Sequence, residues 1–499
     1  MAKIKFGWAE ESIMPNKKIK LAGQFYERVS NGVDTEITVT AFAVESGDDQ
    51  MIICSCDLGG IGVSLNRQVK EMLKDKLPIS VDKVIISATH THASHVYTQS
   101  NELYGPHLSG NSLQYLSKLM PEDMKYVPHV SSEDCMNPND ARDLIANAIV
   151  TAVLKAWENR SEGLYQNAFG RAVIGMNRRV CFDDGSAAMW GDTNSANFEM
   201  LESGNDSGIE LIYIYDTNKN LTGVVANVAC PSQVMEHRNL ISADYWGQLK
   251  LYLDKKFGRK IFVLGLCSAA GDQCPRDMIR WVNGETPVDD PNIERLDYIE
   301  RRADPSMFDL SGLKVVGRRL ANEVIGVYED LGDDFKDEGI LVHETFTLKM
   351  PLRRVTKKEY NESVEKIQNF IDKNKGKNIN YRDNARLHIY AGNAVRYELQ
   401  HTTDTYDNEI HIVRFGDIAI ATNPYELFLD YGNRIRARSR AKQTILIQLA
   451  CGSFGYLPTE RAENGSHYSA YVSSGYTGHI GGDLLVRETV SRINKKFEE

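Results

Sequence analysis

Short runs rich in valine and isoleucine alternate with amphipathic helical patterns along most of the chain, and this alternation constrains the fold most. Six runs have the length and composition of buried strands, at 51–56, 83–88, 223–228, 260–267, 417–422 and 444–449. Three other segments, at 139–159, 244–256 and 313–330, place apolar side chains at helical spacing on one face. The pattern predicts an α/β protein with helices packed on a mixed, largely buried sheet.

Two segments refine this picture. The helix expected at 244–256 has Ser242 or Asp244 as its N-cap and Gly258 just past its end. Residues 355–383 are polar and lysine-rich, which is typical of a solvent-facing helix and loop inserted before the last strands. No repeat or Pro/Gly/Ser-rich linker divides the chain, so we expect one large catalytic domain over 1–499 with that insertion.

Composition excludes several classes of protein. Lys and Arg number 58 against 68 Asp and Glu, a net charge of −10, and no run of five basic residues occurs. These features argue against nucleic acid as a partner. Neither a signal-peptide core nor an apolar stretch long enough for a membrane helix is present, so we expect a cytoplasmic protein with no integral membrane segment. The eight cysteines lack CxxC spacing, which disfavours a disulfide framework and a zinc ribbon.

A histidine cluster follows the strand expected at 83–88. His90 and His92 are two residues apart, so in an extended segment both can point into one pocket at the carboxyl end of the sheet. This arrangement suits a metal ligand beside a proton-transfer group, although satisfied core or surface histidines would give the same pattern. His95 belongs to the same segment.

Later segments place further reactive side chains after apolar strands. Cys230 follows the strand at 223–228 and is either a metal ligand or a small buried apolar residue. Cys274 stands in a small-residue turn, as a nucleophile or a structural thiol. Glu426 is expected in the first turn of a helix, where it could be a ligand or a capping residue. Tyr456 and Tyr468 lie in an aromatic loop near the C-terminus.

Taken in order, these segments resemble the catalytic domain of the neutral/alkaline (non-lysosomal) ceramidases, from about residue 5 to the end. The resemblance implies the mixed-sheet α/β fold of that domain. Those enzymes carry an additional C-terminal β-sandwich, which we expect this chain to lack. The motifs are Leu21-Ala22-Gly23, Thr89-His90-Thr91-His92-Ala93-Ser94, Asn177-Arg178, Cys230-Pro231-Ser232, Leu240-Ile241-Ser242-Ala243-Asp244, Gly271-Asp272-Gln273-Cys274-Pro275, Pro424-Tyr425-Glu426, and the pair Tyr456 and Tyr468.

The resemblance also implies roles for individual residues. The Zn²⁺ ligands would be His90, Cys230, Glu426 and Tyr456. His92 would be the acid/base residue, and Arg178 and Tyr468 would hold polar groups of the substrate or the oxyanion. The chain departs from the family pattern at Cys230, which replaces a zinc histidine, and at Cys274, which replaces a serine and which we keep as a candidate catalytic residue. Zinc accepts thiolate ligands, so a metal site remains compatible with this sequence.

Our first hypothesis is therefore a zinc-dependent hydrolase of an amide (N-acyl) bond in a small-molecule substrate other than ceramide. One alternative is a hydrolase of a glycosidic or other small polar substrate, with a zinc-held Cys230 thiolate as nucleophile and Glu236 or Glu426 as acid. Another is a non-catalytic zinc-binding protein. His95 or His237 could replace a ligand, and Asp57 could orient His90 or His92. Substrate specificity would come from the loops at 99–135 and 183–206.

Overall fold

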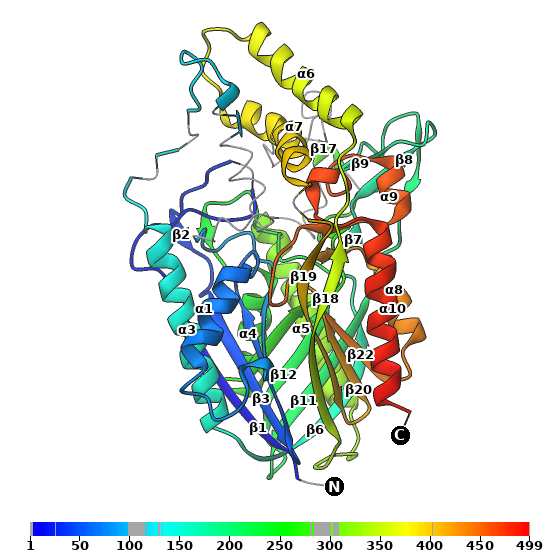
Figure 1. The fold of residues 1–499 in the computed structure, drawn as a ribbon. Coiled ribbons are helices and arrows are strands. Elements are labelled where there is room, and N and C mark those ends of the chain that lie inside the picture. Colours follow the sequence, from blue (N-terminus) through cyan, green and yellow to red (C-terminus); the bar gives the residue numbers. More distant parts are fainter. Residues whose placement is uncertain are drawn as a thin grey trace.

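The computed structural model describes residues 3–97 except position 25, 115–279 except positions 117, 128, 129 and 132, then 282–283, 301–302, 309–401 and 403–498. Two sheets packed face to face form the centre of the described part (Figure 1). The larger has eight strands in the order β14 (Phe262–Cys267), β12 (Leu221–Val228), β11 (Gly208–Asp216), β6 (Ser161–Arg171), β1 (Lys5–Ser12), β3 (Thr38–Ser46), β4 (Asp49–Cys56) and β5 (Val84–Ala88). The smaller has four, β18 (Leu341–Pro351), β19 (Thr405–Phe415), β20 (Ile418–Thr422) and β22 (Gln443–Ile447).

Helices cover the outer face of each sheet and complete four layers (Figure 1). The larger sheet is covered by α1 (Val63–Leu73), α3 (Pro138–Glu158), α4 (Tyr245–Phe257) and α5 (Asp309–Asp330). The smaller sheet is covered by α8 (Leu429–Arg438) and α10 (His479–Lys496). Because both faces of both sheets are covered, most strands read as continuous apolar runs rather than as alternating patterns.

Aromatic rings fill the space between the sheets. Trp8 stacks on Phe42 with ring centroids 4.2 Å apart, and Tyr165 lies 4.5 Å from Phe415 of the smaller sheet. Burial of these large side chains removes much apolar surface from water, and each Å² of apolar surface buried stabilises the folded state by roughly 25 cal/mol. The contact between the sheets is therefore a main source of stability for the whole molecule.

The mixed α/β fold predicted from the sequence is confirmed. All six expected strands are present, as β4, β5, β12, β14, β20 and β22, and the three expected helices are α3, α4 and α5. The ends of α4 also agree with the prediction: the Asp244 carboxylate accepts a hydrogen bond from the amide of Tyr245, and Gly258 adopts φ 65°.

The helix and loop expected at 355–383 are present, but the insertion continues into a second helix that was not predicted. The insertion is a pair of helices, α6 (Lys357–Lys373) and α7 (Tyr381–Leu399), which lies beyond one end of the sheets (Figure 1). Each helix begins at a capping box, at Thr356 and Asn380. Ile367 of α6 and Leu387 of α7 belong to a small separate apolar cluster. The many polar residues on the outer faces conceal this cluster in the sequence, so the segment reads as wholly solvated.

No helix in the described part of the chain has the length and apolar character needed to cross a membrane.

Short elements connect these layers and carry several site residues. The short elements are β2 (Gly32–Val33), η1 (Val81–Lys83), β7 (Met176–Asn177), β8 (Arg179–Phe182), β9 (Ala187–Met189), β10 (Phe198–Leu201), β13 (Leu240–Ile241), β15 (Gln273–Cys274), β16 (Val282–Asn283), β17 (Arg301–Arg302), β21 (Glu426–Leu427), β23 (Tyr456–Leu457), α9 (Glu460–Gly465) and η2 (Val472–Ser474).

Candidate active site

His90 stands two residues past β5, in a left-handed backbone conformation with φ 63°. Its Nδ1 hydrogen-bonds the carbonyl of Gly59, which can only accept, so Nδ1 carries the proton. Nε2 is therefore the ring nitrogen that faces the carboxylate of Glu426, whose Oε2 lies 3.2 Å away. Burial alone would lower the pKa of His90, but the neighbouring Glu426 carboxylate raises it.

Glu426 and Tyr456 are direct partners in a parallel pair of strands, β21 and β23. The Tyr456 hydroxyl hydrogen-bonds the Glu426 carboxylate, and burial would raise the pKa of Glu426 if His90 and Arg178 did not lower it. The prediction that Glu426 begins a helix is wrong. Its amide donates to the carbonyl of Gly455 at 2.9 Å, which extends the chain into β21, and α8 begins only at Leu429.

Arg178 and Tyr468 complete this group. The Arg178 Nη2 donates to the Tyr456 hydroxyl at 3.2 Å and to the carbonyl of Gly271 at 3.0 Å. The Tyr468 hydroxyl lies 3.5 Å from that of Tyr456. The buried Nε of Arg178 has no hydrogen-bond partner among the residues that the structure describes. This N–H is therefore a buried donor whose hydrogen bond is not satisfied by the described residues.

His92 lies beside His90, with the two rings nearly perpendicular and their centroids 5.0 Å apart. Its Nδ1 is 3.1 Å from Oε2 of Glu236. Burial and the neighbouring His90 hold the pKa of His92 well below its ordinary value, so the ring is neutral at pH 7. In the tautomer that carries its proton on Nδ1, the ring donates to Glu236 and Nε2 can accept a proton.

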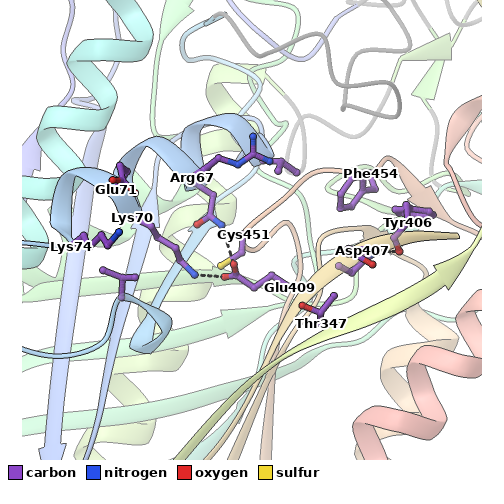
Figure 2. A pocket seen from close by; sticks show the side chains of 14 residues that line it. Arg67, Lys70, Glu71, Lys74, Thr347, Tyr406, Asp407, Glu409, Cys451 and Phe454 are labelled. Carbon is purple, nitrogen blue, oxygen red and sulfur yellow. Dashed lines mark hydrogen bonds and ion pairs between the residues drawn. The ribbon is translucent and has the colours of Figure 1, made fainter. Parts of the chain in front are cut away.

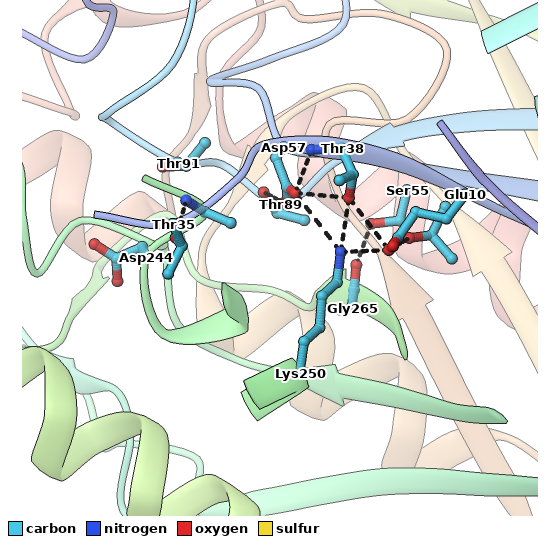
Figure 3. A network of polar contacts seen from close by, with 12 residues as sticks. Glu10, Thr35, Thr38, Ser55, Asp57, Thr89, Thr91, Asp244, Lys250 and Gly265 are labelled. Atoms are coloured by element: carbon cyan, nitrogen blue, oxygen red, sulfur yellow. Dashed lines mark hydrogen bonds and ion pairs between the residues drawn. The ribbon is translucent and has the colours of Figure 1, made fainter. Parts of the chain in front are cut away.

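Asp57, the carboxylate expected to orient these histidines, instead accepts hydrogen bonds from two threonines, Thr38 and Thr89 (Figure 3). It accepts hydrogen bonds from the Thr38 amide at 2.9 Å and from the Thr89 hydroxyl at 3.3 Å. Lys250 joins this network through Thr38 at 2.7 Å and Glu10 at 2.8 Å. The carboxylate in contact with His92 is Glu236, which the sequence analysis considered only as an acid. Its pairing with His92 has no signal in the sequence.

Asp272 joins the segments that carry Arg178 and Glu426. One carboxylate oxygen accepts from the Asn177 side chain and the other from the amide of Leu429, each at 2.9 Å. Burial raises the pKa of Asp272 to about 6. This motif residue therefore positions the site rather than forming part of its surface.

The two candidate cysteines, Cys230 and Cys274, do not belong to the polar group around His90. The Cys230 thiol contacts the carbonyl of Pro231 at 3.4 Å, and it forms no group with His90 and Glu426 in which all ligand atoms lie within 4.8 Å. The Cys274 thiol contacts the carbonyl of Arg276 at 3.4 Å and packs in an apolar cluster with Trp190. Burial raises the pKa of Cys230 well above its ordinary value and that of Cys274 to about 11.

The spare histidines lie outside the polar group. Nε2 of His95 contacts the carbonyl of Ile13 at 2.7 Å, and Nε2 of His237 is 3.5 Å from Asp309. The loop predicted to set specificity at 99–135 lies largely outside the described residues, whereas 183–206 forms β9, β10 and their connection.

A further group of metal-ligand type has no signal in the sequence. Ligand atoms of Glu409, His411 and Cys451 all lie within 4.8 Å of one another. We call these residues the 409–411–451 triad. None stands in a motif, because Cys451 comes to the two strand residues only through the packing of the smaller sheet.

The residues around His90 fit a zinc ion. Nε2 of His90 faces an oxygen of the Glu426 carboxylate at 3.2 Å, and when the ring gives up its Nε2 proton these two atoms can both bind a cation. The Tyr456 hydroxyl is the third oxygen or nitrogen donor at this point. Three such donors match the protein ligand count of an open zinc site.

No protein-family model and no curated protein matches this chain. Two solved structures are similar over its whole length. One, described as a ceramidase complexed with C2, has a TM-score of 0.67 at 15% identity, covering 100% of this chain and 76% of that one. The other, neutral ceramidase from Pseudomonas aeruginosa, has a TM-score of 0.66 at 17% identity, covering 99% and 75%. As its motifs predicted, the chain has the fold of the neutral ceramidases from end to end.

Proposed function

We propose that this protein is a zinc-dependent hydrolase that cleaves an amide (N-acyl) bond in a small molecule. The observation that carries the proposal is the convergence of His90, Glu426 and Tyr456 beside the His92–Glu236 pair. The fold shared with two ceramidases supports the same reaction class. The substitutions at Cys230 and Cys274 favour a substrate other than ceramide.

His90, Glu426 and Tyr456 would hold the ion. A bound zinc ion supplies Lewis acidity and lowers the pKa of a coordinated water from 15.7 to about 7. Gly59 holds the His90 ring with Nε2 available, and Arg178 favours the ionised form of Glu426.

His92 would transfer the proton. Its neutral ring accepts a proton from the attacking water at Nε2 and passes it to the leaving amine. Glu236 fixes the ring through Nδ1 and stabilises the imidazolium formed between these steps. The Tyr468 hydroxyl would donate to the carbonyl oxygen as it becomes negative, and the positive charge of Arg178, next to Tyr456, would stabilise the same oxyanion.

The thiolate alternative has less support. Cys230 forms no ligand group with His90 and Glu426, and without a metal burial raises the pKa of both Cys230 and Cys274, which disfavours the thiolate form. Replacing Cys230 by serine would distinguish the two reactions. The variant keeps amide hydrolysis in our proposal, whereas a thiolate enzyme loses the covalent intermediate that intact-protein mass spectrometry would detect.

The proposal is tested with purified protein, its metal content and a panel of N-acyl amides that includes ceramide, by measuring amine release. We expect His92→Gln to lower kcat by about 10²–10⁴-fold while zinc at this site is retained. Glu426→Gln should lose both activity and that zinc. The exposed His401→Gln serves as control and should behave as wild type.

Full activity after removal of all metal would contradict the proposal, as would full activity of His92→Gln. A non-catalytic zinc protein would show no amine release from any member of the panel. It would also unfold when a closed, four-ligand structural site is chelated.

A further inference from the structure

The 409–411–451 triad shares no residue with the site around His90. Glu409 and His411 are two residues apart on β19 and so lie on one face of that strand. Cys451 stands in the connection from β22 to β23, with φ 57°. Glu409 and Cys451 line a pocket of about 700 Å³ between α1 and the smaller sheet, where Lys70 reaches Glu409 (Figure 2).

Two independent contacts fix the proton of His411 on Nδ1. The Thr345 hydroxyl donates its hydrogen to the carbonyl of Asp82 at 2.6 Å, so at 3.0 Å it can only accept from Nδ1 of His411. His343 donates from Nδ1 to the carbonyl of Gln50 at 3.1 Å. Its Nε2 is therefore also an acceptor for Nδ1 of His411, at 2.9 Å.

Nε2 of His411 is consequently the ring nitrogen that faces the other two residues. This atom lies 2.8 Å from Oε1 of Glu409 and 3.5 Å from Sγ of Cys451. A proton on Nε2 joins the ring to the carboxylate when no metal is bound, and a metal ion can take the place of that proton. The same arrangement occurs between His90 and Glu426, the proposed zinc ligands.

We propose that Glu409, His411 and Cys451 form a second site for a divalent cation of the zinc type. Ideal tetrahedral zinc separates a nitrogen and a sulfur ligand by about 3.6 Å and a nitrogen and an oxygen ligand by about 3.4 Å. The nitrogen–sulfur distance agrees, and the nitrogen–oxygen distance needs only a small movement of the Glu409 side chain. Thiolate with imidazole selects zinc over the harder Mg²⁺ and Ca²⁺.

Binding replaces protons by the cation. The Cys451 S–H bond breaks, its electron pair forms the bond from sulfur to the metal, and this proton and the one on Nε2 of His411 leave to solvent; no atom changes oxidation state. Water from the pocket takes the fourth position. Lys70 donates to Oε1 of Glu409, the oxygen that also faces Nε2 of His411, so binding of the cation requires Lys70 to move off this oxygen or Glu409 to turn Oε2 towards the ion.

The experiment counts metal in full-length protein that has been stripped with a chelator and then given Zn²⁺. We expect two equivalents in wild type. Cys451→Ser should lose one equivalent and keep hydrolytic activity, whereas Glu426→Gln should lose the other equivalent together with activity. Failure of the proposed function and failure of this inference are therefore distinguishable.

Cobalt gives the second readout. Co²⁺-loaded protein should show thiolate-to-cobalt charge-transfer absorption that Cys451→Ser abolishes. Cys230→Ser, a matched control because its thiol is also buried, should retain the absorption. Unchanged metal content and unchanged absorption in Cys451→Ser would overturn the site.

If Cys451→Ser does not fold, the zinc-loaded Glu426→Gln/Cys230→Ser variant answers the question by X-ray absorption. One sulfur scatterer at about 2.3 Å supports the site, and a shell of only nitrogen and oxygen refutes it. Glu409→Gln, which keeps the shape of the side chain, should bind zinc at least tenfold more weakly.

Discussion

A Cβ atom at position 23 would lie 2.3 Å from Cγ of His92, and Gly23 has φ 100°. The His92 ring can occupy its position only because residue 23 has no side chain. The carbonyls of Ala22 and His92 both accept hydrogen bonds from Arg28, which fixes the two segments against each other. The position of the proposed acid/base residue thus depends on a side chain that is absent.

Gly23→Ala should displace His92 and lower kcat by at least tenfold, while the metal content stays that of wild type. Gly47→Ala is the matched control, because Gly47 also has positive φ, at 60°, but nothing lies within 4 Å of its Cβ position. Both variants should lose about 1–2 kcal/mol of stability through backbone strain. Equal activity of the two variants would show that the contact with His92 does not matter.

A buried ion pair sets the loop that carries Tyr468. Nε of Arg179 is 2.7 Å from Glu202, with 0% and 2% of the two side chains exposed. Arg179 also donates to the carbonyls of Ser466 and Tyr468, at 2.8 and 2.9 Å. We expect Arg179→Met to destabilise the protein by about 3–5 kcal/mol, because it leaves the Glu202 charge buried and unpaired.

Urea unfolding measures this loss. Adding Glu202→Leu to Arg179→Met should restore most of the stability, because the unpaired charge is then removed. Activity should stay low in the double variant. This loop has positive φ at Ser466, His467 and Ser469 and loses the guanidinium that holds two of its carbonyls and the Ser469 hydroxyl. A double variant with full activity would show that the loop keeps its shape without Arg179.

At the scale of elements, Glu10 of β1 joins strands to α4. Burial alone would raise its pKa, but Lys250 and Lys260 lower it to about 2. Because the folded-state pKa lies below the ordinary value of 4.5, the ionised carboxylate stabilises the protein above pH 4.5. This contribution disappears as pH falls from 4.5 towards 2.

Glu10→Gln should therefore lower the free energy of unfolding at pH 7 by on the order of 2–3 kcal/mol. The difference between wild type and variant should shrink on acidification and be nearly absent at pH 2. Denaturant titrations at pH 7, 4 and 2.5 measure it. A difference that does not change with pH would assign the loss to packing instead of charge.

The sequence predicted elements better than contacts between them. Buried strands such as β12 and β20 are visible as apolar runs, and α4 is visible through its caps. The helix pair α6–α7 was read as solvated because its apolar residues are few and serve a separate cluster. The extent and the ends of a helix or strand can be predicted from neighbouring residues in the sequence, whereas its packing partners cannot.

For the whole molecule, the His90 group joins residues that follow β5 of the larger sheet to β21, which follows the smaller sheet. Motif order predicted this meeting. The contact of Glu236 with His92 and the 409–411–451 triad were not predicted, because each joins residues that are close in space but far apart in sequence.

A ligand that binds only the folded protein and joins distant segments of the chain should stabilise the whole fold. Zinc at about 1,000 times its Kd should add about 4 kcal/mol per site, and Tm should rise with zinc concentration. The Glu426→Gln/Cys451→Ser variant should show no such rise. Thermal unfolding with and without zinc tests this, and an equal rise in the double variant would place the binding elsewhere.

The parallel pairing of Glu426 with Tyr456 has a consequence for engineering. A slip of one residue between these strands would turn one of the two side chains to the opposite face. Backbone pairing, not side-chain packing, thus decides what stands opposite the glutamate. Position 456 could be exchanged for histidine or cysteine to alter the donor chemistry while the surrounding scaffold is left as it is.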